Sequence, residues 1–197
     1  MKKHLISLFM LLLSMSVTSF IPKFIHIVEK SVSNPPIVII KPLGKIEAST
    51  INKVREFLLT FFPDVRISNN EKMPTEAYYA PRKRYRADRI IRLLNNRSKN
   101  GEIYIGITHS DISTTKGSIP DFGVMGLALR PGNGAVVSDY RLKDKSMLRI
   151  LAIHEIGHTF GLPHCPNKGC YMQDAKGKDH TRQLTRFCDD CNKILKK

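Results

Sequence analysis

Eleven residues in the C-terminal third of the chain, His154 to His164, combine side chains that could bind a metal ion and use it for hydrolysis. His154 and His158 are four residues apart, so on a helix both imidazoles would lie on one face and reach the same zinc ion. Gly161 can adopt the positive φ that ends a helix, which would bring His164 round as a third nitrogen ligand. Three protein ligands leave one tetrahedral position open, which is typical of a catalytic zinc site.

Glu155 directly follows the first of these histidines, and we interpret it as a general base that does not bind the metal. Zinc would lower the pKa of a bound water to about 7 and polarise a substrate carbonyl. Glu155 would take up the proton of that water and return it to the leaving amine. The predicted reaction is therefore hydrolysis of a peptide bond. A single histidine is usually an ordinary surface or core residue, but three at this spacing seldom arise from packing alone.

All four cysteines of the chain follow this motif as two close pairs, Cys165 with Cys170 and Cys188 with Cys191. This spacing predicts a second, structural zinc ion enclosed by four thiolates. Two disulfides are the alternative, because a chain that carries an export signal would fold where disulfides can form. The short spacing within each pair favours the metal site, since a stabilising disulfide more often closes a long loop.

The order of these motifs resembles that of the archaemetzincins, a family of metzincin-clan zinc peptidases. The resemblance is strong over residues 154–191 and rests on the positions His154, Glu155, His158, Gly161, His164, Cys165, Cys170, Met172, Cys188 and Cys191. It implies that Met172 forms a Met-turn, a hydrophobic floor beneath the three imidazoles. It also implies that the four cysteines hold a second zinc ion, which gives two zinc ions per chain. On the sequence alone, Met172 would also suit ordinary core packing.

The N-terminal half of the predicted domain begins with a strand, helix, strand unit. Ile37–Ile40 is a short apolar run between prolines and predicts a buried strand. Apolar residues at helical spacing from Ile51 to Phe61 predict a helix, which Ser49 or Thr50 could cap. Val65–Ile67 is the second strand. Such a unit normally implies parallel pairing with a right-handed crossover.

A further helix is expected over residues 81–96, and the active-site helix is expected to begin at Lys145 or Ser146. Further strands are expected over residues 103–107, 123–129 and 135–138. One of the later strands would form an edge of the sheet. An extended peptide can be bound by adding itself to such an edge, and Val124–Leu129 is the candidate, with an ordinary sheet strand as the alternative. The predicted fold is one zincin-like α/β (α+β) domain. It would comprise a mixed twisted sheet, the active-site helix and a small C-terminal subdomain with the cysteine zinc site.

Three segments are expected along the chain. Residues 1–19 have a basic start, an apolar run and small polar residues, as in a signal peptide, with an uncleaved membrane anchor as the alternative. Residues 20–36 form a linker, and residues 37–197 form the zinc peptidase domain. A cleaved signal would make the protein exported, either periplasmic or secreted.

The chain is strongly basic, with 32 Lys and Arg against 17 Asp and Glu and a formal net charge of +15. Such a charge attracts acidic peptides, anionic membranes or polyanions, although a solvated surface explains it equally well. The predicted 81–96 helix would carry the densest basic patch, formed by Arg82, Lys83, Arg84, Arg86, Arg89 and Arg92. A second hypothesis is thus a zinc-stabilised protein that binds polyanions or nucleic acid, with a vestigial histidine site. No aromatic stacking platform accompanies the patch, so we predict no specific nucleic acid. We expect a monomer that acts on a peptide or protein substrate, which could be acidic.

Overall fold

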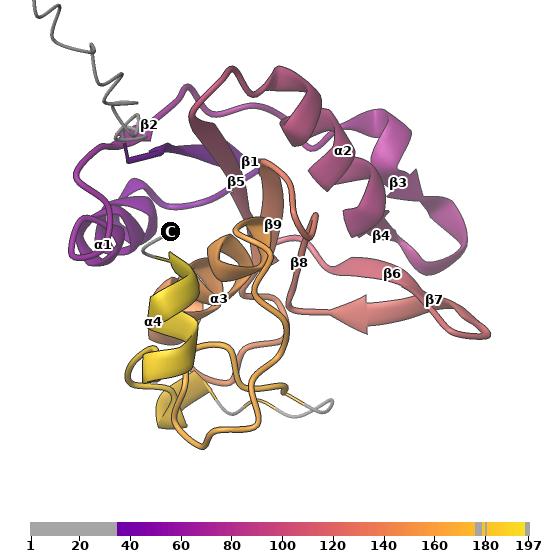
Figure 1. Cartoon of the computed structure of the whole chain (residues 1–197). Helices are drawn as coiled ribbons and strands as arrows, with labels where there is room; N and C mark the ends of the chain where they lie inside the picture. Colours follow the sequence, from indigo (N-terminus) through magenta and orange to yellow (C-terminus); the bar gives the residue numbers. More distant parts are fainter. Residues whose placement is uncertain (1–34, 176–178, 180, 196–197) are drawn as a thin grey trace, which may run out of the picture. The chain divides into compact units, whose positions relative to one another are not determined.

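The computed structural model of the chain describes residues 35–175, 179 and 181–195 (Figure 1). The predicted signal peptide and residues 20–34 of the predicted linker lie outside the described residues. In the described part of the chain, no helix is both long and apolar enough to cross a membrane.

The larger sheet has five strands in the order β2-β1-β5-β9-β8. Their bounds are β1 Ile37–Leu43, β2 Val65–Ile67, β5 Glu102–Thr108, β9 Gly134–Ser138 and β8 Gly126–Ala128. The first four run parallel, whereas β8 pairs antiparallel with β9 and forms the edge. The predicted parallel strand, helix, strand unit is confirmed, because β1 pairs directly with β2 across α1 (Ala48–Leu58).

Helices cover both faces of this sheet (Figure 1). Alternate residues of β9 pack against helices on opposite faces. Ala135 and Val137 of β9 pack into a core shared with α1 and α3 (Leu148–Thr159). Val136, between them, packs instead into a second core with α2 (Ala87–Arg97). All five residues of β9 are buried, as is common for a parallel strand with a helix on each side. The sheet therefore forms a middle layer, and α3 is held against one face of it.

Helix α1 differs from the prediction at both ends. It begins at Ala48 after Glu47, so Ser49 and Thr50 lie inside the first turn and do not cap it, and no side chain caps the helix. It ends at Leu58, and Phe61 lies beyond it with 38% of its surface exposed.

A smaller sheet has four strands in the order β3-β4-β6-β7. They are β3 Tyr78–Tyr79, β4 Arg84–Arg86, β6 Ile112–Lys116 and β7 Ile119–Val124. The prediction of a helix over residues 81–96 is wrong in its first part, because α2 begins only at Ala87. The preceding residues form a 3-10 turn and strand β4, in which Arg84 pairs with the distant carboxylates of Asp111 and Asp121.

The single strand predicted over residues 123–129 is divided between the two sheets. β7 ends at Val124, Met125 carries the chain across, and β8 begins at Gly126. β7 pairs with β6 in a hairpin that the sequence analysis did not identify, and Gly117 supplies its turn with a φ of 56°. The expectation of an edge strand is confirmed, because β8 forms an edge of the larger sheet and β7 forms an edge of the smaller one.

The active-site helix begins close to the expected residues. Lys145–Met147 form a 3-10 turn, and the Asp144 carboxylate accepts from the backbone N–H of Ser146 at 3.0 Å. α3 continues from Leu148, and every residue of it except Arg149 is buried. The chain after α3 folds beneath it and ends in α4 (Asp189–Leu195) (Figure 1).

Candidate active site

Helix α3 places two of the predicted histidines next to each other. His154 and His158 lie on successive turns, their ring centroids are 4.7 Å apart, and their Nε2 atoms are 3.2 Å apart. Both side chains are buried, which lowers the pKa of His154 to about 3 and that of His158 to about 4. Burial thus keeps both imidazoles neutral, and the neutral form is the one that binds a metal.

Backbone carbonyls fix the orientation of both rings. The Nδ1 of His154 lies 2.6 Å from the carbonyl oxygen of Tyr171, and the Nδ1 of His158 lies 2.7 Å from that of Leu162. A carbonyl oxygen only accepts, so each Nδ1 must carry the proton and donate it. Each Nε2 then presents its lone pair to the space between the rings, which is the arrangement found around protein-bound metals.

The third histidine reaches the same space through the turn predicted at Gly161. This glycine has a φ of 89°, and its N–H donates to the His158 carbonyl at 2.8 Å. The His164 ring follows with its centroid 5.4 Å from that of His154 and 4.9 Å from that of His158. One nitrogen from each of the three histidines lies within 4.8 Å of the other two. A nitrogen set of this kind fits a zinc ion.

Glu155 lies in a pocket of about 630 Å³ that His154 and His164 also line. Its side chain is buried, which raises the pKa of the carboxyl to about 8. A group in this range can both accept and release a proton near neutral pH. Gly126, whose type and position in the sequence predict no role in catalysis, lies beside this carboxylate. A β-carbon placed on Gly126 would be 2.4 Å from Glu155 Oε1, so only glycine allows this approach.

Two segments of the chain line the pocket. One runs along the end of β7 and the start of β8, from Phe122 to Gly126, and the other follows α3 and includes Gln173, Thr181 and Leu184. The candidate edge strand therefore borders the pocket at the side of Glu155.

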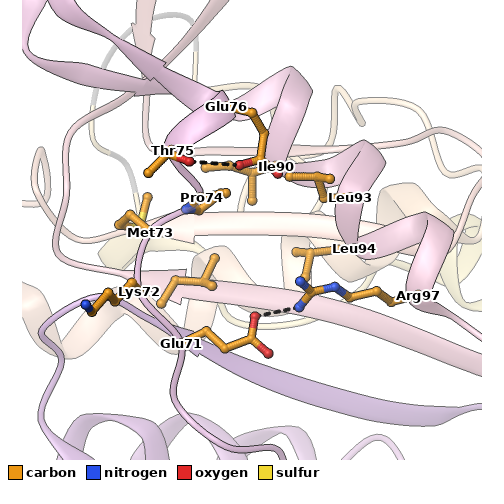
Figure 2. Close-up of a pocket in the computed structure, with 11 residues that line it drawn as sticks. Glu71, Lys72, Met73, Pro74, Thr75, Glu76, Ile90, Leu93, Leu94 and Arg97 are labelled. Atoms are coloured by element: carbon orange, nitrogen blue, oxygen red, sulfur yellow. Dashed lines mark hydrogen bonds and ion pairs between the residues drawn. The ribbon is translucent and has the colours of Figure 1, made fainter.

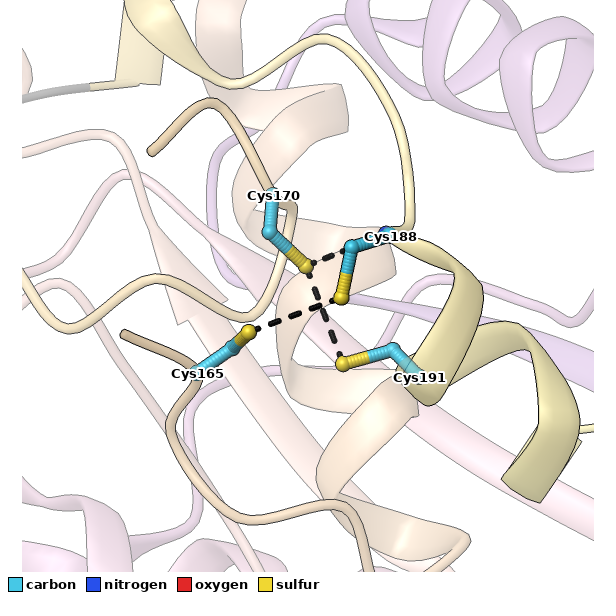
Figure 3. A group of neighbouring side chains, drawn as sticks. All are labelled: Cys165, Cys170, Cys188 and Cys191. Atoms are coloured by element: carbon cyan, nitrogen blue, oxygen red, sulfur yellow. Dashed lines mark hydrogen bonds between the residues drawn. The ribbon is translucent and has the colours of Figure 1, made fainter. Parts of the chain in front are cut away.

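The side chains of the four cysteines point toward one another (Figure 3). They are buried and free of disulfides, and their sulfur atoms all lie within 4.8 Å of one another. The closest sulfur pairs are Cys165 with Cys188 at 3.6 Å and Cys170 with Cys191 at 3.7 Å.

Backbone N–H groups also face this cysteine cluster. That of Asn167 donates to Cys165 at 3.4 Å, and that of Cys188 donates to Cys170 at 3.4 Å. A hydrogen bond from the N–H of Cys191 lowers the pKa of the Cys188 thiol, whereas burial raises the pKa of the Cys165 and Cys191 thiols. Donors that stabilise thiolates and four converging sulfurs fit a tetrahedral zinc site better than disulfides.

Met172 lies between the two clusters and is fully buried. Its carbonyl accepts from the N–H of Cys165 at 2.7 Å, while the neighbouring Tyr171 carbonyl orients His154. Residues 165–172 thus connect the cysteine cluster to the histidines.

His109 and a smaller pocket do not belong to these clusters. His109 pairs with the buried Asp139 at 2.7 Å, whereas His4, His26 and His180 lie outside the described residues. A pocket of about 270 Å³ beside α2 has the Glu71–Arg97 ion pair (2.6 Å) on its wall and contains none of the predicted site residues (Figure 2).

Comparison with known proteins agrees with this geometry. The family model described as Peptidase family M54 matches residues 37–197. The chain is 32% identical over 176 residues to an archaemetzincin of Haloquadratum walsbyi, covering 81% of this chain and 99% of the relative.

Two solved structures are similar to this one over most of their length. The crystal structure of archaemetzincin from Archaeoglobus fulgidus has a TM-score of 0.68 at 27% identity, over 80% of this chain and 98% of that chain. Archaemetzincin from Methanopyrus kandleri has a TM-score of 0.68 at 26% identity, over 81% of this chain and 93% of that chain. This chain therefore belongs to the archaemetzincins, the zinc metallopeptidases of family M54.

Proposed function

We propose that this protein hydrolyses peptide bonds with His154, His158 and His164 as the ligands of a catalytic zinc ion and Glu155 as the general base. One observation carries the proposal: three imidazole nitrogens converge beside a buried carboxylate at the wall of an open pocket. The basic binding protein remains the second hypothesis. Membership in a peptidase family and the pairing of Arg84 and Arg86 with carboxylates both favour the peptidase.

The chemistry divides between the metal and the side chains. A zinc ion held by the histidines would polarise the substrate carbonyl and make a bound water more acidic. Glu155 accepts the proton of the attacking water and then donates it to the amine of the leaving product. The carbonyls of Tyr171 and Leu162 keep the His154 and His158 rings in place while this happens.

The edge of β8 is suited to hold the substrate in an extended form. Met125 and Leu129 bond toward β9, through Ser138 N–H to Met125 O (2.8 Å) and Leu129 N–H to Gly134 O (3.0 Å). Backbone groups alternate in direction along an antiparallel strand, so those of Gly126 and Ala128 point away from β9. A peptide added to this edge would pass directly beside Glu155.

The four cysteines would hold a second zinc ion with a structural role. A site with four protein thiolates has no open position for water or substrate. Its contribution would be to fix residues 165–172, which support His154 through Tyr171.

The substitution Glu155→Gln tests this mechanism. The amide is close in size to the carboxylate but cannot accept the proton, so turnover should fall by about 10²- to 10⁴-fold while zinc content stays unchanged. The zinc content of the purified variant is compared with that of the wild type, and both are assayed on a peptide library analysed by mass spectrometry. Undiminished cleavage by the zinc-loaded variant would remove the mechanism.

A further inference from the structure

The pocket carries positive charge at its end next to the β6–β7 hairpin. Lys116, Phe122, Gly123 and Arg141 line it there, and the Lys116 ammonium lies 4.8 Å from the centroid of the Phe122 ring. We infer that this end binds a carboxylate of the substrate on the C-terminal side of the cleaved bond, with Arg141 as the main contact. This inference rests on the proposed function, because it assigns a position to the bond that is cut.

Arg141 is held in a fixed orientation toward the pocket. Its Nε and Nη2 each donate to the Asp111 carboxylate at 2.8 Å, which is a bidentate ion pair. Its guanidinium lies against the backbone of Gly123, where a β-carbon would be 2.3 Å from Arg141 Cζ. The side chain is 35% exposed, and the pair with Asp111 leaves Nη1 to donate to another group. The guanidinium is thus pre-organised for a second carboxylate.

The charges around Arg141 leave a positive excess. Asp111 is shared, because Arg84 Nε also lies 3.1 Å from it. The described ion pairs of this cluster involve four arginines but three carboxylates, namely Arg82, Arg84, Arg86 and Arg141 with Asp88, Asp111 and Asp121. Lys116 adds a further positive charge at the same end of the pocket. An incoming carboxylate would therefore meet an attractive field.

The direction of β8 indicates on which side of the cleaved bond Arg141 and Lys116 would lie. Antiparallel pairing is the more stable kind, so a peptide added to β8 would run opposite to it. Its C-terminal part would then pass from Gly126 toward Gly123 and Arg141. Glu155 lies beside Gly126, which is where the bond is cut. Three residues at about 3.3 Å each separate these glycines along the chain, and the bend at Met125 shortens that span, so the carboxylate would follow the cleaved bond by about two or three residues.

Asp174, Asp179 and Lys143 also line the pocket, so acidic side chains outnumber lysine and arginine side chains away from the hairpin end. Asp174 Oδ2 lies 3.9 Å from Nδ1 of His164, and Asp179 accepts from the N–H groups of Lys143 and Thr181 at 3.1 Å. The carboxylate in question could be an Asp or Glu side chain of the substrate or the free C-terminus of a short peptide. These two sources correspond to internal and near-terminal cleavage respectively.

A set of matched peptides tests the inference. Starting from a sequence that the enzyme cuts, two versions carry Glu or Gln at the third residue after the cut and end two residues later in an amide. Two further versions carry Gln there and end at that residue in a free acid or an amide. The wild type should cleave versions with the carboxylate with a kcat/KM on the order of ten-fold higher than versions without it. Arg141→Gln should remove most of this preference, and Lys116→Gln should reduce it. Lys53→Gln, which removes one exposed positive charge outside the pocket, should leave it unchanged.

Binding separates this inference from the proposed mechanism. Fluorescence anisotropy of the labelled acid and amide peptides is measured on Glu155→Gln, with and without Arg141→Gln. If the wild type cleaves no peptide, the proposed function fails, yet a ten-fold binding preference that depends on Arg141 would still support the carboxylate site. Equal affinity for the acid and amide peptides would overturn it. Should Arg141→Gln fail to fold, the same comparison with Lys116→Gln decides.

Discussion

Gly157 and Met172 are in direct contact: a β-carbon placed on Gly157 would lie 2.4 Å from the sulfur of Met172. This glycine lies on α3 between His154 and His158, and Met172, which packs against it, is fully buried. The contact gives a physical meaning to the Met-turn implied by the family resemblance, since the methionine packs against the one helix position without a side chain.

Gly157→Ala should destabilise the protein, although alanine is favoured over glycine inside a helix by about 1 kcal/mol. The added methyl group has no space, because Leu162 Cδ1 is also only 3.4 Å away, and overpacking typically costs about 1–3 kcal/mol. Thermal unfolding of the zinc-loaded proteins measures the effect. In a protein that already carries Met172→Ala, the further change Gly157→Ala should cost less stability than it does in the wild type, because the methyl group then has space. A single variant more stable than the wild type would contradict the contact.

Gly126→Ala should reduce activity without unfolding the protein. The new methyl group would lie 2.4 Å from Glu155 Oε1, and the end of that flexible side chain can rotate away. A displacement of about 1 Å in a catalytic group can cost 10²-fold, so we expect kcat/KM to fall at least ten-fold or so. Steady-state kinetics, zinc content and the melting temperature of the variant check this. Normal kcat/KM would show that Glu155 does not need its present position.

Chelation should remove the two predicted zinc ions at different rates. His164 is 48% exposed at its side chain, whereas the four cysteines are buried. A chelator should therefore extract the histidine zinc first and abolish activity while the second zinc and the secondary structure remain. Zinc content, activity and circular dichroism are followed on the same samples. Loss of both ions in one step, together with unfolding, would speak against two independent roles.

The ion pair of Glu71 with the buried Lys41 predicts a pH dependence of stability. Hydrogen bonds from Lys41 and then Arg97 hold the pKa of Glu71 below its usual value. A lowered pKa stabilises the fold above the ordinary pKa of the carboxyl, and this contribution is lost as the pH falls through the lowered value. Glu71→Gln removes it, so the variant should melt below the wild type at neutral pH, with the difference shrinking as the pH falls below the ordinary pKa of the carboxyl. A constant difference across that range would contradict the assignment.

Local spacing predicted the chemistry of the chain better than its architecture. His154, His158 and His164 could be assigned because a helix and one glycine turn suffice to bring them together. The cysteine cluster follows in the same way from two short pairs. The parallel pairing of β1 with β2 was also predictable, since an apolar run, an amphipathic helix and a second strand leave few arrangements.

Features that depend on distant partners could not be predicted. Arg84 and Arg86 suit a helix by composition, but the segment forms β4 because it pairs with β3 and the distant β6, beside the carboxylates of Asp111 and Asp121. A glycine in a strand can signal a close approach, as at Gly126, but the sequence does not say that Glu155 is the neighbour. The carbonyls that orient the histidines carry no signal in the sequence, because every residue has one.

The segment that links the histidines to the cysteines has a practical consequence. Cys165 and Met172 are joined by a backbone hydrogen bond, and the adjacent Tyr171 carbonyl holds His154. Cobalt bound by four thiolates absorbs visible light, whereas zinc has a filled d shell and does not. Cobalt bound in the cysteine cluster would therefore report optically on residues 165–172. Changes at the histidines that alter this segment could then be followed by the visible absorption of the protein.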